Sequence, residues 1–236
     1  MVAKKEKDHL QGKMKYLIDP TYVTRCPLSV LPDSFAYLTG WDFFKKWNIV
    51  ERLNKKAFKK FDGIDFNFCL AGLMEKDGIT INEKKVEKIK NKNWKIYAFH
   101  GSHEDLRGQF KYMELNFAED SYDSRMKILS QLKVVKELST EPNPIIVYHA
   151  GTVKNKPANI DSTLKNIEFA VKEAEERGII IAIENAPRDV EGNYNIGSDY
   201  NDLKKILKKI DSPNLGICFD WGHANNYAGV YAKEKK

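Results

Sequence analysis

The sequence predicts an α/β fold, a (β/α)-barrel that ends after about six strands, and three observations lead to this prediction. Short apolar runs rich in β-branched residues recur along the chain, segments with helical periodicity follow them, and polar residues end successive runs at nearly constant spacing. The chain has 236 residues, of which 42% are hydrophobic, which is enough to bury one sizeable core. We therefore expect one domain at 14–231, with loose tails at 1–13 and 232–236.

Six apolar runs are expected to form the strands. The last three are nearly free of polar residues, which is typical of parallel strands buried on both faces, and the first three are weaker. In chain order the runs are 14–18, 63–68, 94–99, 145–148, 179–183 and 215–219.

Three apolar stripes at helical spacing lie between these runs. One stripe follows Asp161 or Ser162 as the expected N-cap and precedes Gly178, which is expected to stop the helix. Each helix should lie outside the strands that it connects. The stripes cover 126–135, 164–174 and 203–210.

The spacing of strand-end residues favours a barrel over an open sheet. Asp65 and His100 are 35 positions apart. The same separation of 35 recurs from His149 to Glu184, and Asp220 follows 36 positions later. From His100 to His149 there are 49 positions, which predicts a loop insertion. Such units match a TIM (β/α)-barrel of about 250 residues divided by eight, so Asp220 is expected to close the sixth strand.

Composition and charge narrow the class of protein. The net charge of +6 comes from lysines spread over every predicted helix and both ends, which indicates solvated helix faces and does not favour a nucleic-acid partner. No apolar run approaches the roughly 18 residues of a membrane span, and the charged start resembles no signal peptide. The three widely spaced cysteines match no disulfide framework. We expect a cytoplasmic protein with no membrane partner.

Polar side chains gather where four consecutive predicted strands end. These ends carry His100, His149 and Glu184, and then Asp220 with His223 three positions later. The C-terminal ends of barrel strands converge on one rim, so residues far apart in sequence meet there. Carboxylate and imidazole together suit zinc, manganese or cobalt best, with magnesium as a further option. The pattern therefore predicts a divalent-metal site.

Each of these residues also has a structural alternative. A carboxylate after a strand, such as Glu184, can cap a helix or form an ion pair. A single histidine, such as His100 or His149, can simply pack or hydrogen-bond. Four strand ends in register are harder to explain by packing, so their combination favours a site.

Several segments resemble the xylose-isomerase-like barrel superfamily, which contains sugar phosphate isomerases and epimerases and the type-four apurinic endonucleases. The resemblance lies in 183–187, which reads IENAP, and in 218–224, which reads CFDWGHA. The segment 147–151, VYHAG, is similar to the superfamily's fourth-strand histidine segment, and 97–101, YAFHG, to its third-strand one.

This resemblance implies that Glu184 and Asp220 bind the metal. It also implies that Glu184 is one of two acid/base groups that move a proton beside a carbonyl, through an enediolate. The superfamily's further ligands, from a seventh and an eighth strand, would lie beyond Lys236. The residues expected to bind substrate or additional metal are His100, His149, Asn185 and His223.

Three functions follow from these expectations. The leading hypothesis is a metal-dependent isomerase or epimerase whose partner is a small sugar or sugar phosphate. The alternatives are an apurinic endonuclease-like phosphodiesterase and a non-catalytic truncated barrel. Because six strands leave two unpaired edges, a second copy of the chain or a completing chain is an expected partner.

Overall fold

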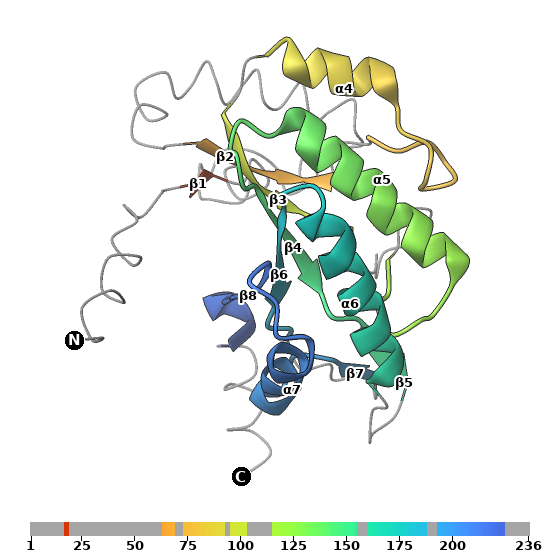
Figure 1. Ribbon diagram of the computed structural model, residues 1–236, viewed down its shortest axis with the longest axis vertical. Coiled ribbons are helices and arrows are strands. Elements are labelled where there is room, and N and C mark those ends of the chain that lie inside the picture. Colours follow the sequence, from red (N-terminus) through yellow and green to blue (C-terminus); the bar gives the residue numbers. More distant parts are fainter. Residues whose placement is uncertain are drawn as a thin grey trace, which may run out of the picture.

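The computed structural model places most of the second half of the chain and parts of the first (Figure 1). The predicted tails at 1–13 and 232–236 lie outside the described residues, so the domain boundaries stay a prediction. The loop insertion expected before His149 lies partly outside them as well. The described residues are 17–18, 63–68, 73–92, 95–102, 115–154, 160–187 and 193–224.

A six-stranded parallel sheet forms the centre of the fold and confirms the predicted α/β class. Its strands lie side by side in chain order, and every neighbouring pair is parallel, as in the wall of a (β/α)-barrel. All six predicted runs contribute a strand, with slightly shifted ends. The strands are β1 (Leu17–Ile18), β2 (Gly63–Asn67), β3 (Ile96–His100), β4 (Ile145–His149), β6 (Ile180–Glu184) and β8 (Leu215–Cys218).

Helices α4, α5 and α6 form a layer along one side of this sheet (Figure 1). The three predicted stripes lie in α5, α6 and α7, and α4 is an addition that the sequence did not predict. The α6 stripe is buried throughout, whereas only Leu132 and Val135 of the α5 stripe and Leu203 and Ile206 of the α7 stripe are buried. The helices are α4 (Glu83–Lys90), α5 (Tyr122–Leu138), α6 (Asp161–Glu175) and α7 (Tyr200–Ile210).

The two ends of α6 test the predicted cap and stop. The N-cap is Ile160, which makes no side-chain cap hydrogen bond, so the prediction of Asp161 or Ser162 is wrong. Asp161 instead lies in the first turn, where a carboxylate interacts favourably with the helix dipole. The predicted stop is confirmed, since Gly178 takes a left-handed φ of 65° and turns the chain into β6.

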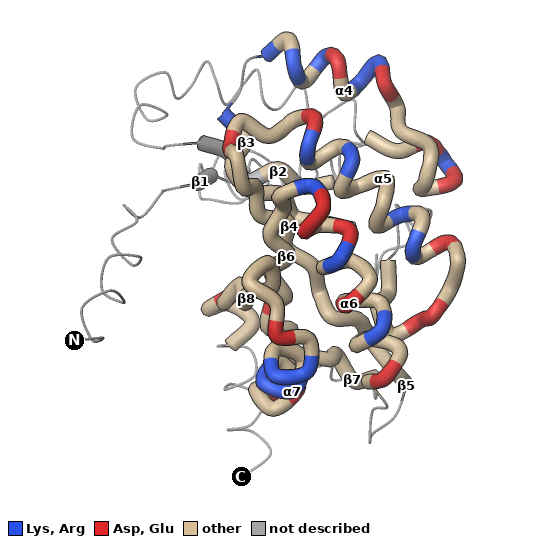
Figure 2. Tube along the Cα trace, in the orientation of Figure 1, with Lys and Arg blue, Asp and Glu red and all other residues tan. Residues whose placement is uncertain are grey.

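The core lies between the sheet and its helices. Phe99 and Tyr148 from the strands, and Leu132 and Ile167 from the helices, are fully buried. Charged residues lie on the outer surfaces of the helices, and Figure 2 marks lysine positions along much of α7, as expected for a solvated face. None of the helices in the described ranges combines the length and the apolar character that a membrane span requires.

A short antiparallel ribbon stands next to the C-terminal ends of the strands. It consists of β5 (Thr152–Lys154), just after β4, and β7 (Asn193–Asn195), after β6. The Thr152 hydroxyl donates a hydrogen bond of 2.7 Å to Asn195 Oδ1, which ties the ribbon together. The ribbon therefore borders the rim where the predicted site lies.

The outer edge of the sheet at β8 is apolar. Ile217 pairs in register with buried Ile183, yet 41% of its surface is exposed. Phe219 and Trp221 are 55% and 79% exposed, and their rings meet edge to face with centroids 4.9 Å apart. Within the described part of the chain, β6 is the only strand paired with β8.

Candidate metal centre

Three of the predicted site residues are the last residues of three strands. His100 ends β3, His149 ends β4 and Glu184 ends β6. His149 is paired in register with Glu184, whereas His100 is paired with Val147 and thus lies one pleat earlier along the sheet. Because side chains two positions apart share a face, all three point to the same face of the sheet.

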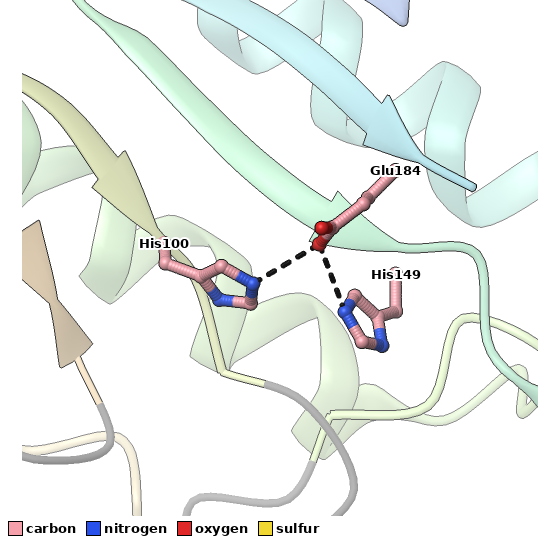
Figure 3. Close-up of side chains that lie close together, drawn as sticks. All are labelled: His100, His149 and Glu184. Carbon is pink, nitrogen blue, oxygen red and sulfur yellow. Dashed lines mark hydrogen bonds and ion pairs between the residues drawn. The ribbon is translucent and has the colours of Figure 1, made fainter. Parts of the chain in front are cut away.

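The two histidines converge on one oxygen atom (Figure 3). The Nε2 atoms of His100 and His149 lie 3.1 and 2.9 Å from Oε2 of Glu184. The Glu184 side chain is 7% exposed, and the two imidazoles are 19% and 27% exposed. A buried carboxylate is thus flanked by two imidazoles that solvent can reach.

Burial and hydrogen bonding act on Glu184 in opposite directions. Burial alone raises the pKa of Glu184, because it penalises the charged form. The hydrogen bonds with His100 and His149, and the attraction of these imidazoles, outweigh burial and hold the pKa of Glu184 well below its usual range. The carboxylate is therefore ionised at neutral pH, as a metal ligand must be.

The hydrogen bonding of His100 fits a cation at this place. Its Nδ1 lies 3.0 Å from the carbonyl oxygen of Gly101, and its Nε2 faces the Glu184 carboxylate. A neutral imidazole has only one N–H and cannot donate to two acceptors. Both contacts are satisfied if the ring is protonated, or if Nδ1–H donates to the carbonyl and Nε2 binds a cation shared with Glu184, the usual arrangement of a metal-bound histidine.

A second group of candidate ligands uses the other side of Glu184. Ligand atoms of Glu184, Asp220 and His223 all lie within 4.8 Å of one another. His223 Nδ1 is 3.7 Å from Oε1 of Glu184 and only 2.7 Å from the backbone carbonyl oxygen of Asn185. If Nδ1–H donates to that carbonyl, Nε2 of His223 keeps the lone pair that can bind a metal or accept a proton.

Asn185 lies inside this cluster, but its side chain is engaged with the backbone. Its Nδ2 donates to the carbonyl oxygen of Asp220 over 2.9 Å, and its Oδ1 accepts from the Asp220 N–H over 2.6 Å. The residue is 7% exposed. Its expected role in binding substrate or metal stays a prediction.

The structure thus brings all six predicted residues together. The His149 ring stands between the other two imidazoles, with its centroid 5.4 Å from that of His100 and 5.7 Å from that of His223. Two groups of three potential ligands share Glu184: His100, His149 and Glu184, and Glu184, Asp220 and His223.

Gly101, for which the sequence predicted no separate role, follows His100 directly and contributes to the site. A Cβ atom at Gly101 would overlap the ring of Tyr148, which is fully buried. Glycine is therefore required where the chain leaves β3. The carbonyl oxygen of the same residue contacts Nδ1 of His100. The pair His100–Gly101 was visible in the sequence, but the contact with Tyr148 is not local.

Comparison with known proteins places this fold in a family. Residues 61–235 match the family described as xylose isomerase-like TIM barrel, and the chain belongs to it. The recognised resemblance and the barrel fold are thereby confirmed.

Solved structures of an epimerase-like protein and of a sugar epimerase share the fold. A D-tagatose 3-epimerase-like protein is 24% identical with a TM-score of 0.58, over 90% of this chain and 67% of that one. D-allulose 3-epimerase from Methylomonas sp., in complex with D-allulose, is 12% identical with a TM-score of 0.55, over 90% of this chain and 64% of that one.

An uncharacterized protein of Methanocaldococcus jannaschii is 36% identical over 96 residues, which is 38% of this chain and 30% of that protein. The chain thus spans about a third of this relative and about two thirds of the epimerase structures.

Proposed function

We propose that the protein is a metal-dependent isomerase or epimerase of a sugar or sugar phosphate, with Glu184 as its acid/base residue. The observation that carries this proposal is one buried, ionised carboxylate shared by two groups of potential ligands. The epimerases with the same fold support a small sugar as the substrate class. Ketohexoses such as D-tagatose and D-allulose are therefore the first compounds to test.

We assign separate roles in metal binding to three of these residues. Glu184 and Asp220 would hold a divalent ion, manganese, cobalt or zinc by preference and magnesium as a further option, with His223 as a ligand or a substrate contact. When bound, such an ion polarises the substrate oxygens and makes the carbon beside the carbonyl more acidic.

The two oxygens of Glu184 are not equivalent. Oε2 accepts from His100 and His149, while Oε1 has His223 at 3.7 Å as its contact. We therefore place the ion held with Asp220 on the Oε1 side and assign proton transfer to the Glu184 carboxylate as a whole. The carboxylate would take a proton from the carbon beside the carbonyl and leave the substrate as an enediolate, with the electron pair on the former carbonyl oxygen. The histidines on Oε2 keep Glu184 ionised and hold its plane in place.

Exchange of a carbon-bound proton tests this proposal. The chain is incubated with manganese and each ketohexose in D2O, and the loss of the proton signal beside the carbonyl is followed by NMR. Glu184→Gln is expected to slow exchange by about 10²- to 10⁴-fold, the usual contribution of a general base. Glu168→Gln, which changes an exposed glutamate of α6, is the matched control. Equal exchange in both variants would rule out the role of Glu184.

A second candidate function is cleavage of a phosphodiester at abasic DNA, as in the apurinic endonucleases. It is favoured by the group of His100, His149 and Glu184, which would allow two ions to share Glu184. Two ions close together suit an in-line displacement at phosphorus. Hydrolysis of an abasic duplex at low salt, without exchange on any sugar, would replace the first proposal with this one.

The apolar edge at β8 supports a partner that pairs with it, either a second copy or a completing chain. Exposed Ile217, Phe219 and Trp221 would be covered in that assembly. Size-exclusion chromatography decides this point, because a stable monomer would argue against an obligatory partner. A monomer without metal or exchange activity would favour the non-catalytic barrel.

A further inference from the structure

The end of β8 is fastened to the end of β6 through one side chain. The regular pairing of these strands ends with Glu184 opposite Cys218, and the N–H of Asn185 adds one more hydrogen bond of 3.2 Å to the Cys218 carbonyl. Two residues further on, the backbone of Asp220 forms hydrogen bonds with the side-chain amide of Asn185. This side chain therefore continues the hydrogen bonding between the two segments beyond the last paired residues of the strands.

The amide of Asn185 is matched to both backbone groups of Asp220. It donates to the Asp220 carbonyl over 2.9 Å and accepts from the Asp220 N–H over 2.6 Å, the pattern that a neighbouring strand would offer. An ionised carboxylate at position 185 could only accept, an alanine could do neither, and a hydroxyl would have to make both contacts through one oxygen atom. With 7% exposure, the pair is shielded from competing water.

The contacts continue from Asp220 to His223. Oδ1 of Asp220 accepts from the His223 N–H over 2.8 Å, and the Asn185 carbonyl faces His223 Nδ1 at 2.7 Å. Both candidate ligands from this turn are thus oriented through residue 185. His100 and His149, in contrast, end β3 and β4 and approach Glu184 from the other side.

We propose that Asn185 is a positioning residue that fastens the turn of Asp220 and His223 to β6, and so assembles one of the two cation groups independently of the other. This inference rests on the proposed metal-dependent function. Asn185 would act on the ion only by orienting Asp220 and His223, without contacting the ion itself.

Asn185→Ala tests the inference, with Asn214→Ala as the matched control. Asn214 Nδ2 donates over 2.8 Å to the carbonyl of Ile179 and bridges the other ends of the same two strands. Urea unfolding first checks that both variants are folded. Hydrogen exchange of the Asp220 and His223 amides in metal-free protein is then expected to rise about fivefold or more in Asn185→Ala only.

Cobalt(II) titration, followed by its visible absorption, supplies the second readout. Asn185→Ala is expected to weaken one of two binding events by roughly 10- to 100-fold, as for other residues that orient ligands, and to leave the second unchanged. His149→Ala should weaken the event that Asn185→Ala spares, and Asn214→Ala should change neither.

The outcomes separate this inference from the proposed function. Unchanged amide exchange in Asn185→Ala overturns the positioning role, whether or not cobalt binds. Equal weakening of both events overturns the independence of the two groups. A wild type that binds no cobalt, combined with faster exchange in Asn185→Ala alone, supports the positioning of the turn and overturns the metal function.

Discussion

Replacing Glu184 by glutamine should make the metal-free protein less stable and remove most of its stabilisation by metal. The wild-type carboxylate is buried and accepts two hydrogen bonds, from His100 at 3.1 Å and from His149 at 2.9 Å. Hydrogen bonds to a charged group contribute about 1.5–3 kcal/mol each, and neutral ones about half of that. Since glutamine can still accept neutral bonds, we expect a loss of about 1.5–3 kcal/mol in the free energy of unfolding.

The effect of metal on Glu184→Gln can be worked out in the same way. At a metal concentration of about 100 times Kd the wild type gains about 2.7 kcal/mol, because the ion binds the folded state only. A variant that binds about 100-fold more weakly gains about 0.4 kcal/mol at the same concentration. In the presence of metal, the smaller gain from binding should therefore add to the loss of stability already expected for the metal-free variant.

The pH dependence of Glu184 has a defined sign. The folded-state pKa of Glu184 is lowered, so its contribution is fully present above the unfolded pKa of about 4.3 and is lost as the pH falls through the folded value. The groups that face this carboxylate are His100, His149 and His223. As the pH falls below about 4.3, the wild type should therefore begin to lose its advantage over Glu184→Gln, and the loss should grow at each lower pH.

Urea unfolding at pH 7 and in steps down to pH 3, with and without manganese, provides these free energies. Glu168→Gln again serves as the control for the loss of one surface charge. A Glu184→Gln variant as stable as the wild type at pH 7, with an equal gain from manganese, would refute the view that both histidines and a cation depend on this carboxylate.

Three further variants test the packing around the site. Tyr148→Phe should leave the free energy of unfolding, measured in urea, unchanged or raise it by up to about 1 kcal/mol, because the Tyr148 hydroxyl is buried without a partner among the described residues. Gly101→Ala should lose about 1–3 kcal/mol, since its Cβ would overlap the Tyr148 ring, and calorimetric melting will show this. Asp211→Gly should raise the melting temperature slightly and the free energy of unfolding by up to about 1 kcal/mol. Asp211 has a left-handed φ of 45° at the end of α7, a conformation that glycine adopts without steric cost.

The strands and the strand-end residues could be predicted because their signals are local. Apolar runs such as 145–148 and 179–183 give a strand its character, and the polar residue after each run marks its end. Parallel pairing in chain order then brings equivalent ends together. His149 and Glu184, each the last residue of its strand, are paired opposite each other in the sheet.

Other features depend on contacts that no local pattern reveals. The helix α4 buries only Val86 and Ile89, which is too short a stripe to recognise. The ribbon of β5 and β7 has three residues in each strand and alternates little in polarity. The N-cap at Ile160 is set by burial of that residue in the core, which overrides the preference for a polar cap.

The origin of the ligands in separate strands has a consequence for the kinetics of folding. Glu184 is 35 positions from His149 and 84 from His100, so no two of these side chains meet until distant strands have paired. Such non-local pairing forms slowly and late. A cation at this site should therefore leave the folding rate nearly unchanged and slow unfolding, so that the metal-bound protein would survive heat or protease longer than its equilibrium stability alone suggests.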